Sequence, residues 1–549
     1  MKKQSFLQGS LLLAGSALAA KLCGALFKLP LTAMLGGTGM GHFSTAYGLF
    51  LPLYAVLVTG LSTAVARPVA AYTAQGDTAA ARRVRSTARW LFLLAGTVGS
   101  AAAVLLARPF ALASTGGVAA YPAVLAIAPA VLLCCLAAVE RGYWEGRCTM
   151  VPTAVSQLAE AVVKLVCGLW LAGRFLRTPP PFLAGCSPEA AGACGAVIGV
   201  TAGAGAGLVC VYLRSVLAAR EPVSGTVPGR RETVRVLLAV MVPAALGALV
   251  ADMMSLIDLM LAMRSFGTSL RENAAAFRAS AHVPSSIADG DAAAFVYGSF
   301  IGLAVTVFDL VPSLTNTMAR SVLPCAAQRW AAGDRDGTAA CAGQALVLTG
   351  LLAFPAGCGL TALARPALAF LFAGRPDEVA AAAGSLRLLA PGMVCLCLVM
   401  PVFSLLQAVG RERVPVLLML PGLAVKLAGD LVLLPRMHAE GAALATSLSY
   451  AAILVPALVV LRRTIGPLPG VGRLLAAMLW AGAMCGAAAY LVCDRVPLPP
   501  RGAFVLAVTA GAAVYAALLA LAVGRPLLAR FRPPRRPCAS GKCSKCQLC

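Results

Sequence analysis

The sequence predicts an all-α polytopic membrane protein with about fourteen transmembrane helices. We expect two six-helix lobes related by a parallel pseudo-twofold repeat, followed by two extra C-terminal helices. The chain of 549 residues is 60% hydrophobic and only 12% charged, whereas soluble domains are about 25% charged. Apolar runs of about 20 residues recur to its end, and each is long enough to cross a hydrocarbon core of ~30 Å. An internal duplication gives the third indication.

The predicted helices divide the chain into five parts. An N-terminal lobe covers 1–218, a cytoplasmic linker 219–235, and a C-terminal lobe 236–465. Two additional helices lie within 466–525, and a basic, cysteine-rich cytoplasmic tail covers 526–549. The apolar runs are centred on 6–28, 44–66, 88–107, 121–139, 152–173, 194–213, 236–262, 295–318, 341–363, 386–408, 414–434, 440–461, 473–493 and 504–523.

Basic residues set the predicted orientation. With both termini in the cytoplasm, the inner segments hold most of the Lys and Arg, including a cluster at 82–89. This is the positive-inside pattern, and it adds an attraction to anionic lipid headgroups. Because residues bordering membrane spans explain the net charge of +24, we expect membrane lipids as partners and no nucleic acid.

The first six predicted helices are duplicated as the next six. Lys164 and Lys426 lie in apolar stretches 262 residues apart, and the sequence around them is similar. Tyr-Gly and Ala-Arg pairs also recur, with Arg67 and Arg320 at matching cytoplasmic helix ends. Because six is even, both copies enter the membrane with the same orientation, which predicts a twofold axis along the membrane normal and a cleft between the lobes.

Four lysines at membrane depth are the candidate substrate-binding residues. An ionisable side chain in hydrocarbon costs roughly 3 kcal/mol or more, so it normally faces a partner or a wet cavity. Lys21 and Lys28 are seven residues apart on one face of the first helix, and Lys164 and Lys426 are the duplicated pair. A cation placed twice by duplication favours a transporter with a charged central cavity. The alternative for Lys21 and Lys28 is that they extend toward the membrane interface.

Acidic residues form the predicted gating or ion-coupling set. Glu160 precedes Lys164 by four residues and Asp430 follows Lys426 by four, so each can form an ion pair on one helix face. Such a pair either braces its lobe or exchanges partners during transport. Three further residues lack an obvious partner in their own helix, and we expect them to pair with the first-helix lysines or to couple transport to Na⁺ or H⁺. They are Asp252, Asp258 and Asp309.

Several motifs resemble one family. Residues 141–146, reading RGYWEG, are followed by MVPTAVSQ at 150–157 and by Glu160. This order is similar to the signature of the stage V sporulation protein B group, as are the opening residues 3–10 and Asp258 after Ile257. The group belongs to the MOP superfamily, together with MATE exporters, O-antigen-type flippases and the MurJ lipid II flippases.

The resemblance implies a function in the bacterial cytoplasmic membrane. It implies two lobes that alternate between inward- and outward-open states and move undecaprenyl-pyrophosphate-linked cell-wall precursors from the inner to the outer leaflet. It also implies that basic residues of the first helix, here Lys21 and Lys28, contact the diphosphate, and it leaves Arg141 at a cytoplasmic helix end. Cell-wall synthesis proteins are the expected protein partners. A MATE-type ion-coupled exporter and an envelope-assembly scaffold stay open as alternatives.

The sequence indicates no catalytic site, and we expect no enzyme activity and no required cofactor. It contains no Walker A motif and no clustered catalytic carboxylates or histidines. Four thiols in the tail, spaced C-x4-C-x2-C-x2-C, form one hypothetical zinc site. The alternatives are an unstructured thiol tail or a lipidated one. These cysteines are Cys538, Cys543, Cys546 and Cys549.

Overall fold

The structure is a computed structural model that describes residues 6–115, 118–147, 149–217, 228–411, 413–497 and 499–531. All regular structure in this described part is helical, which confirms the predicted all-α class. The helices are α1 (Phe6–Leu57), α2 (Leu61–Ala74), α3 (Thr78–Thr115), α4 (Tyr121–Gly146), α5 (Val151–Arg177), η1 (Pro181–Leu183), α6 (Pro188–Leu217), α7 (Arg230–Glu272), α8 (Ala274–Ser280), α9 (Asp289–Ser299), η2 (Phe300–Val305), α10 (Thr306–Phe308), α11 (Leu310–Ala331), α12 (Arg335–Ala362), α13 (Ala364–Leu371), α14 (Pro376–Ala408), α15 (Arg413–Ile465), α16 (Val471–Arg495) and α17 (Pro500–Phe531).

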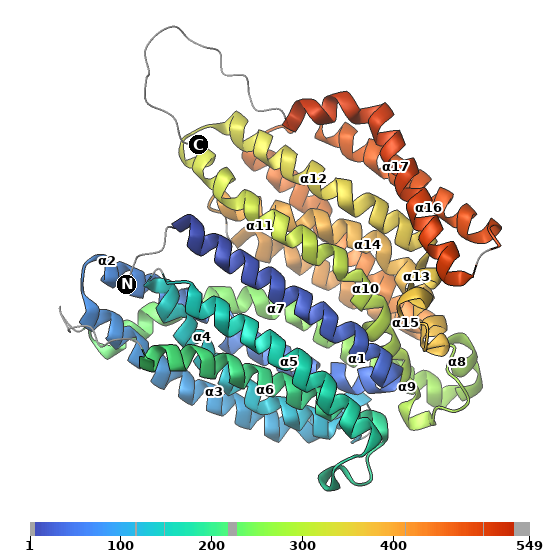
Figure 1. Cartoon of the computed structure of the whole chain (residues 1–549), viewed down its shortest axis with the longest axis horizontal. Helices are drawn as coiled ribbons and strands as arrows, with labels where there is room; N and C mark the ends of the chain where they lie inside the picture. The colour runs from blue at the N-terminus through green and yellow to red at the C-terminus, as the bar shows by residue number, and fades with distance from the viewer. Residues whose placement is uncertain are drawn as a thin grey trace.

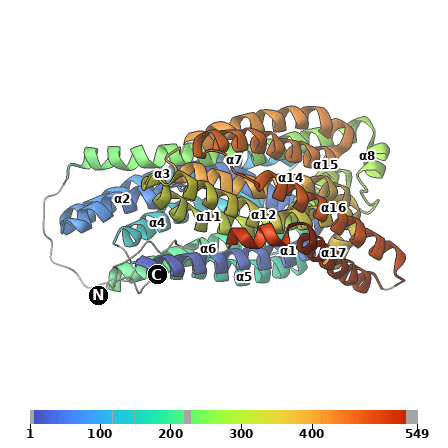
Figure 2. The same cartoon turned by 90° about the horizontal axis from the view of Figure 1, so that it is seen from above.

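Eleven of the described helices are long and apolar enough to cross a membrane. Helices suit a bilayer because each satisfies its own backbone hydrogen bonds without water. The long helices run side by side in roughly one direction (Figure 2). The chain is therefore a multi-pass membrane protein, and the number of fourteen spans stays a prediction.

Two of these helices are hairpins with two antiparallel arms. In α1 the backbone leaves helical geometry at Gly36, where φ is 65°. The rings of Phe27 and Phe43 are 6.2 Å apart, although 16 residues of straight helix would separate them by about 24 Å. In α15 the chain reverses at His438, and Ser449 Oγ donates to the carbonyl of Gly422 at 2.8 Å.

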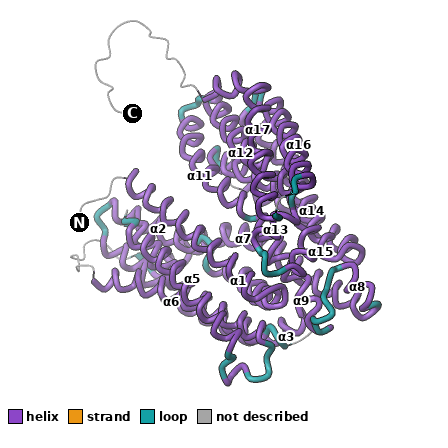
Figure 3. The backbone as a smooth tube through the Cα atoms, turned by 45° about the vertical axis from the view of Figure 1, so that its right-hand side comes forward, coloured by secondary structure: helices purple, strands orange, loops and turns teal. Residues whose placement is uncertain are grey.

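The buried apolar side chains gather separately in the two halves of the chain. Two clusters draw on residues 27–241 and three on residues 259–519. Helix α7 contributes Leu237 and Met241 to an N-terminal cluster, and Leu259 and Met263 to a C-terminal one. Figures 1 and 3 show α2–α6 and α11–α17 as two groups on either side of α1 and α7. The residue boundaries and the symmetry of the predicted lobes stay predictions.

At one end the two halves meet backbone to backbone, in what we call the tip contact. A Cβ added to Gly298 of α9 would lie 1.8 Å from the carbonyl oxygen of Gly37, and one added to Gly41 would lie 2.3 Å from the carbonyl oxygen of Ala294. Small residues allow this close approach of helices. Arg375, before α14, donates to the carbonyl of Met34 at 2.8 Å. The tip of the α1 hairpin is therefore fixed to the C-terminal half.

Candidate functional site

Lys426 forms a buried charge cluster that joins α7 to both arms of α15. Its Nζ lies 2.7 Å from Asp258 Oδ1 and 2.8 Å from Asp430 Oδ1, and it donates to the carbonyl of Ala442 at 3.2 Å. Lys426 is 3% exposed, Asp258 8% and Asp430 0%. The expected pair of Lys426 and Asp430 is present. Asp258, which we expected to reach the first-helix lysines or to act in coupling, lies against Lys426.

Lys164, the duplicate of Lys426, has different surroundings. Its Nζ donates to Tyr47 Oη at 3.2 Å and lies 5.1 Å from the centre of the Phe27 ring. Phe27 and Tyr47 belong to the two arms of α1, so the ammonium group lies between those arms. The ion pairs of the described residues give Lys164 no carboxylate partner. The direct contacts of its ammonium group are a hydroxyl and the faces of aromatic rings, which attract a cation.

Glu160 bonds Arg141, and the expected ion pair of Glu160 with Lys164 is not among the ion pairs of the described residues. Arg141 Nη2 lies 2.7 Å from Glu160 Oε2, and Arg141 Nε donates to Ser156 Oγ at 2.9 Å. The planar guanidinium group from α4 bonds two side chains of α5 at once, which an ammonium group cannot match in geometry. Arg141 therefore joins α4 to α5, in addition to its predicted place near a helix end.

Lys28 and Asp309 form a contact between the two halves. Lys28 Nζ lies 3.9 Å from Asp309 Oδ2, and the side chains are 29% and 57% exposed. This agrees with the expectation that an unpartnered aspartate meets a first-helix lysine. An ion pair this long and exposed contributes little, about 0–1 kcal/mol. Both groups can therefore exchange this partner for another at small cost.

Comparison with known proteins identifies the family. Residues 33–499 match the family described as Lipid II flippase MurJ. The chain belongs to the MurJ family. The Lipid II flippase MurJ of Bacillus subtilis (strain 168) is 23% identical over 477 residues, which are 84% of this chain and 83% of that protein. Stage V sporulation protein B of the same organism is 27% identical over 166 residues, 30% of this chain and 32% of that protein.

Solved structures show the same fold. A lipid II flippase MurJ in an inward closed conformation matches this MurJ-family chain with a TM-score of 0.70, at 13% identity, over 95% of this chain and 100% of that one. An inward-facing MATE transporter of the MOP superfamily matches with a TM-score of 0.63, at 14% identity, over 82% of this chain and 96% of that one. The predicted relationship is confirmed, and the family is one of transporters rather than enzymes.

The remaining predicted site residues of this MurJ-family chain either take part in no ion pair described above or lie outside the described residues. Asp252 is half-buried on α7 and has no ion pair among the described residues, and Arg67 is exposed on α2. The side chains of Lys21 and Arg320 lie outside the described residues, as does the tail. The hypothetical zinc site therefore stays a hypothesis. It involves Cys538, Cys543, Cys546 and Cys549.

The sequence did not indicate the aromatic surroundings of Lys164 or the residues that fix the tip of the α1 hairpin. Tyr47 belongs to the duplicated Tyr-Gly pair, which was the available signal for its importance. Arg375 and Glu378 lie outside every motif. Glu378 is 6% exposed, and its Oε1 accepts from the backbone N–H of Gly37 at 3.4 Å. Only the folded hairpin brings these groups together.

Proposed function

We propose that this protein is a flippase for an undecaprenyl-pyrophosphate-linked cell-wall precursor, lipid II or a related polysaccharide precursor. It would move this lipid from the inner to the outer leaflet of the bacterial cytoplasmic membrane by alternating access. The observation that carries the proposal is the state of the charges at Lys164 and Lys28. Lys28 belongs to α1 and Lys164 contacts it from α5. Lys164 has no carboxylate partner among the described residues, and Lys28 has a long, exposed one.

The cargo chemistry follows from these cations. A diphosphate that crosses the membrane must exchange water for fixed cations, which bind phosphate oxygens through charge-assisted hydrogen bonds. Lys28 can offer such bonds from α1, which contacts both halves, and Lys164 from α5, which packs on α1. We assign the same role to Lys21. A cationic drug would instead need a carboxylate-lined site, which makes the MATE-type exporter the weaker alternative. A scaffold needs no unpaired charge at membrane depth.

Lys426 has a separate role in this proposal. Three oxygens surround its ammonium group, and oxygens are also the ligands that hard metal cations prefer. Na⁺ could bind Asp258 and Asp430 only after Lys426 moved away. Two carboxylates against one ammonium leave one formal negative charge, which a single proton neutralises. We therefore propose H⁺ rather than Na⁺ as the coupling ion at this cluster.

Alternating access requires the tip contact to open. The backbone contact of Gly298 with the α1 hairpin and the bonds of Arg375 join the halves at that end. The ion pair of Lys28 with Asp309 also connects the two halves, but it is long and exposed and therefore weak. The proposal is that the tip contact separates in the other state and exposes the cargo's headgroup to the opposite side.

Rescue of a bacterial strain depleted of its own lipid II flippase tests the proposal. The wild-type chain should restore growth, and Lys164→Ala should not, at equal protein level. Lys164→Arg should retain rescue because the cation is kept, and Arg67→Ala is the matched control at an exposed site. Equal rescue by Lys164→Ala would remove Lys164 from the substrate site. No rescue by the wild type would contradict this cargo.

A further inference from the structure

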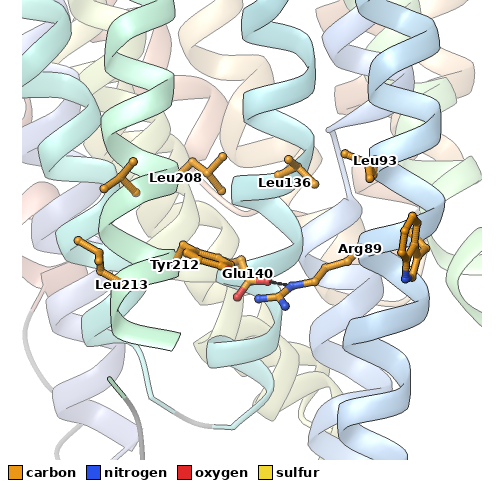
Figure 4. A pocket seen from close by; sticks show the side chains of 9 residues that line it. Arg89, Leu93, Leu136, Glu140, Leu208, Tyr212 and Leu213 are labelled. Atoms are coloured by element: carbon orange, nitrogen blue, oxygen red, sulfur yellow. Dashed lines mark hydrogen bonds and ion pairs between the residues drawn. The ribbon is translucent and has the colours of Figure 1, made fainter. Parts of the chain in front are cut away.

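We propose a specific binding site for one anionic phospholipid in a groove between α3, α4 and α6. The groove encloses about 570 Å³ and has two layers, which Figure 4 shows. Leu93, Leu136 and Leu208 form an apolar layer. Arg89, Glu140 and Tyr212 form a polar layer one helical turn away, on the side of the basic cluster at 82–89.

The spacing of the layers matches a phospholipid. Each polar residue is four positions from an apolar one on the same helix, which corresponds to a rise of about 6 Å. An acyl chain can occupy the apolar layer while the phosphate lies at the level of Arg89. Tyr212 and Trp90 are 48% and 63% exposed at the groove, and aromatic rings of this kind are typical of the membrane–water interface.

The charge around the groove favours an anionic headgroup. Glu140 is 2% exposed and is bonded by both Arg85 and Arg89. Ser215 Oγ also donates to it, at 2.9 Å. Two guanidinium groups share one carboxylate, so one positive charge is left over. The Arg89 side chain is 37% exposed and lines the groove, which places this charge where a lipid phosphate can accept from it.

This groove differs from the proposed transport site. Glu140 faces α3 and α6 through its bonds to Arg85, Arg89 and Ser215. The next residue, Arg141, faces α5 instead. The cations proposed to bind the cargo lie on α1 or contact it, and among the described residues those that line the groove come from α3, α4 and α6. The occupant we assign is therefore a phospholipid of the surrounding bilayer rather than the transported lipid.

Quenching of Trp90 by brominated lipids tests the site. The purified full-length chain is reconstituted in phosphatidylcholine vesicles with increasing fractions of dibrominated phosphatidylglycerol. The signal of Trp90 is taken as the difference from Trp90→Phe. We expect half-maximal quenching at a several-fold lower fraction of phosphatidylglycerol than of dibrominated phosphatidylcholine. Arg89→Gln should reduce this preference roughly fivefold, the effect of one surface cation on anionic lipid binding.

Three further variants separate binding from damage to the fold. Arg89→Lys should keep most of the preference. Arg83→Gln, which removes an exposed arginine of α3 outside the groove, should leave it unchanged. Leu208→Phe should fill the apolar layer and weaken quenching by both lipids. Equal quenching by the two lipids in the wild type, or an equal loss with Arg83→Gln and Arg89→Gln, would overturn the proposal.

Discussion

Replacement of Lys426 with methionine should destabilise the protein more than any other single change in its charge cluster. Asp258 and Asp430 are 8% and 0% exposed, and both bond Lys426 directly. Without the ammonium group, two neighbouring buried carboxylates repel each other. Removing one partner of a buried ion pair costs about 3–5 kcal/mol in the free energy of unfolding, and we expect Lys426→Met to lie in this range.

Two comparison variants should cost less free energy of unfolding than Lys426→Met. Asp258→Asn leaves Lys426 and Asp430 as a balanced pair, so it should cost about 1.5 kcal/mol, the low end for a charged hydrogen bond. Lys164→Met changes the duplicated lysine, which has aromatic neighbours and no carboxylate partner among the described residues. Its loss should change the free energy of unfolding by about 1 kcal/mol or less.

Thermal unfolding of the purified variants in detergent, followed by tryptophan fluorescence, measures the order. The unfolding midpoint should fall most for Lys426→Met, less for Asp258→Asn and least for Lys164→Met. Combining Lys426→Met with Asp258→Asn and Asp430→Asn should recover most of the loss, because no buried charge remains. The reasoning fails if Lys426→Met unfolds at or above the midpoint of Asp258→Asn.

Three other predictions concern the helix contacts and the orientation. Arg141→Ala should lower the unfolding midpoint more than Arg67→Ala, since the former bonds two α5 side chains; equal midpoints would contradict this. Gly298→Val should force the tip contact apart and increase hydrogen–deuterium exchange in the tip of the α1 hairpin, and unchanged exchange would show that the contact tolerates a side chain. In single-cysteine chains, Cys186 should react with an impermeant thiol reagent on intact cells. A cysteine placed by Arg83→Cys should react only after permeabilisation, and the opposite pattern would reverse the predicted orientation.

The fold class could be predicted because each long hydrophobic run of a membrane protein corresponds to a helix. The positions at which the helices end could not be predicted in this way. The expected runs 6–28 and 44–66 left a connection between them, whereas the structure continues the helix to Gly36 and restarts it at once. Leu31 and Leu35 are 0% and 1% exposed, so packing extends the helix beyond the apolar run. The positive φ of Gly36 then reverses the chain within one residue.

A specific ion pair could be predicted only where both residues lie on one helix, whereas the contact of Lys28 with Asp309 was expected only as one of several possible pairs. Asp430 lies one turn after Lys426, and this pair forms as the spacing predicts. The same spacing failed for Glu160 because Arg141 from the neighbouring helix offers a better geometry. Asp258 is 168 residues from Lys426, and no helical periodicity connects the two. Which cations remain without a carboxylate partner therefore depends on tertiary packing.

Transport of lipid II in proteoliposomes tests the proposed function most directly. The purified chain is reconstituted with lipid II that carries a fluorescent headgroup, and dithionite is added outside to reduce the accessible fluorophores. The wild type should bring inner-leaflet lipid to the outer surface, so that fluorescence falls below the protein-free plateau. Lys164→Met should remain folded and stay at that plateau. Full activity of Lys164→Met, or no loss of fluorescence with the wild type, would contradict a flippase that binds its cargo's diphosphate through Lys164 and the lysines of α1.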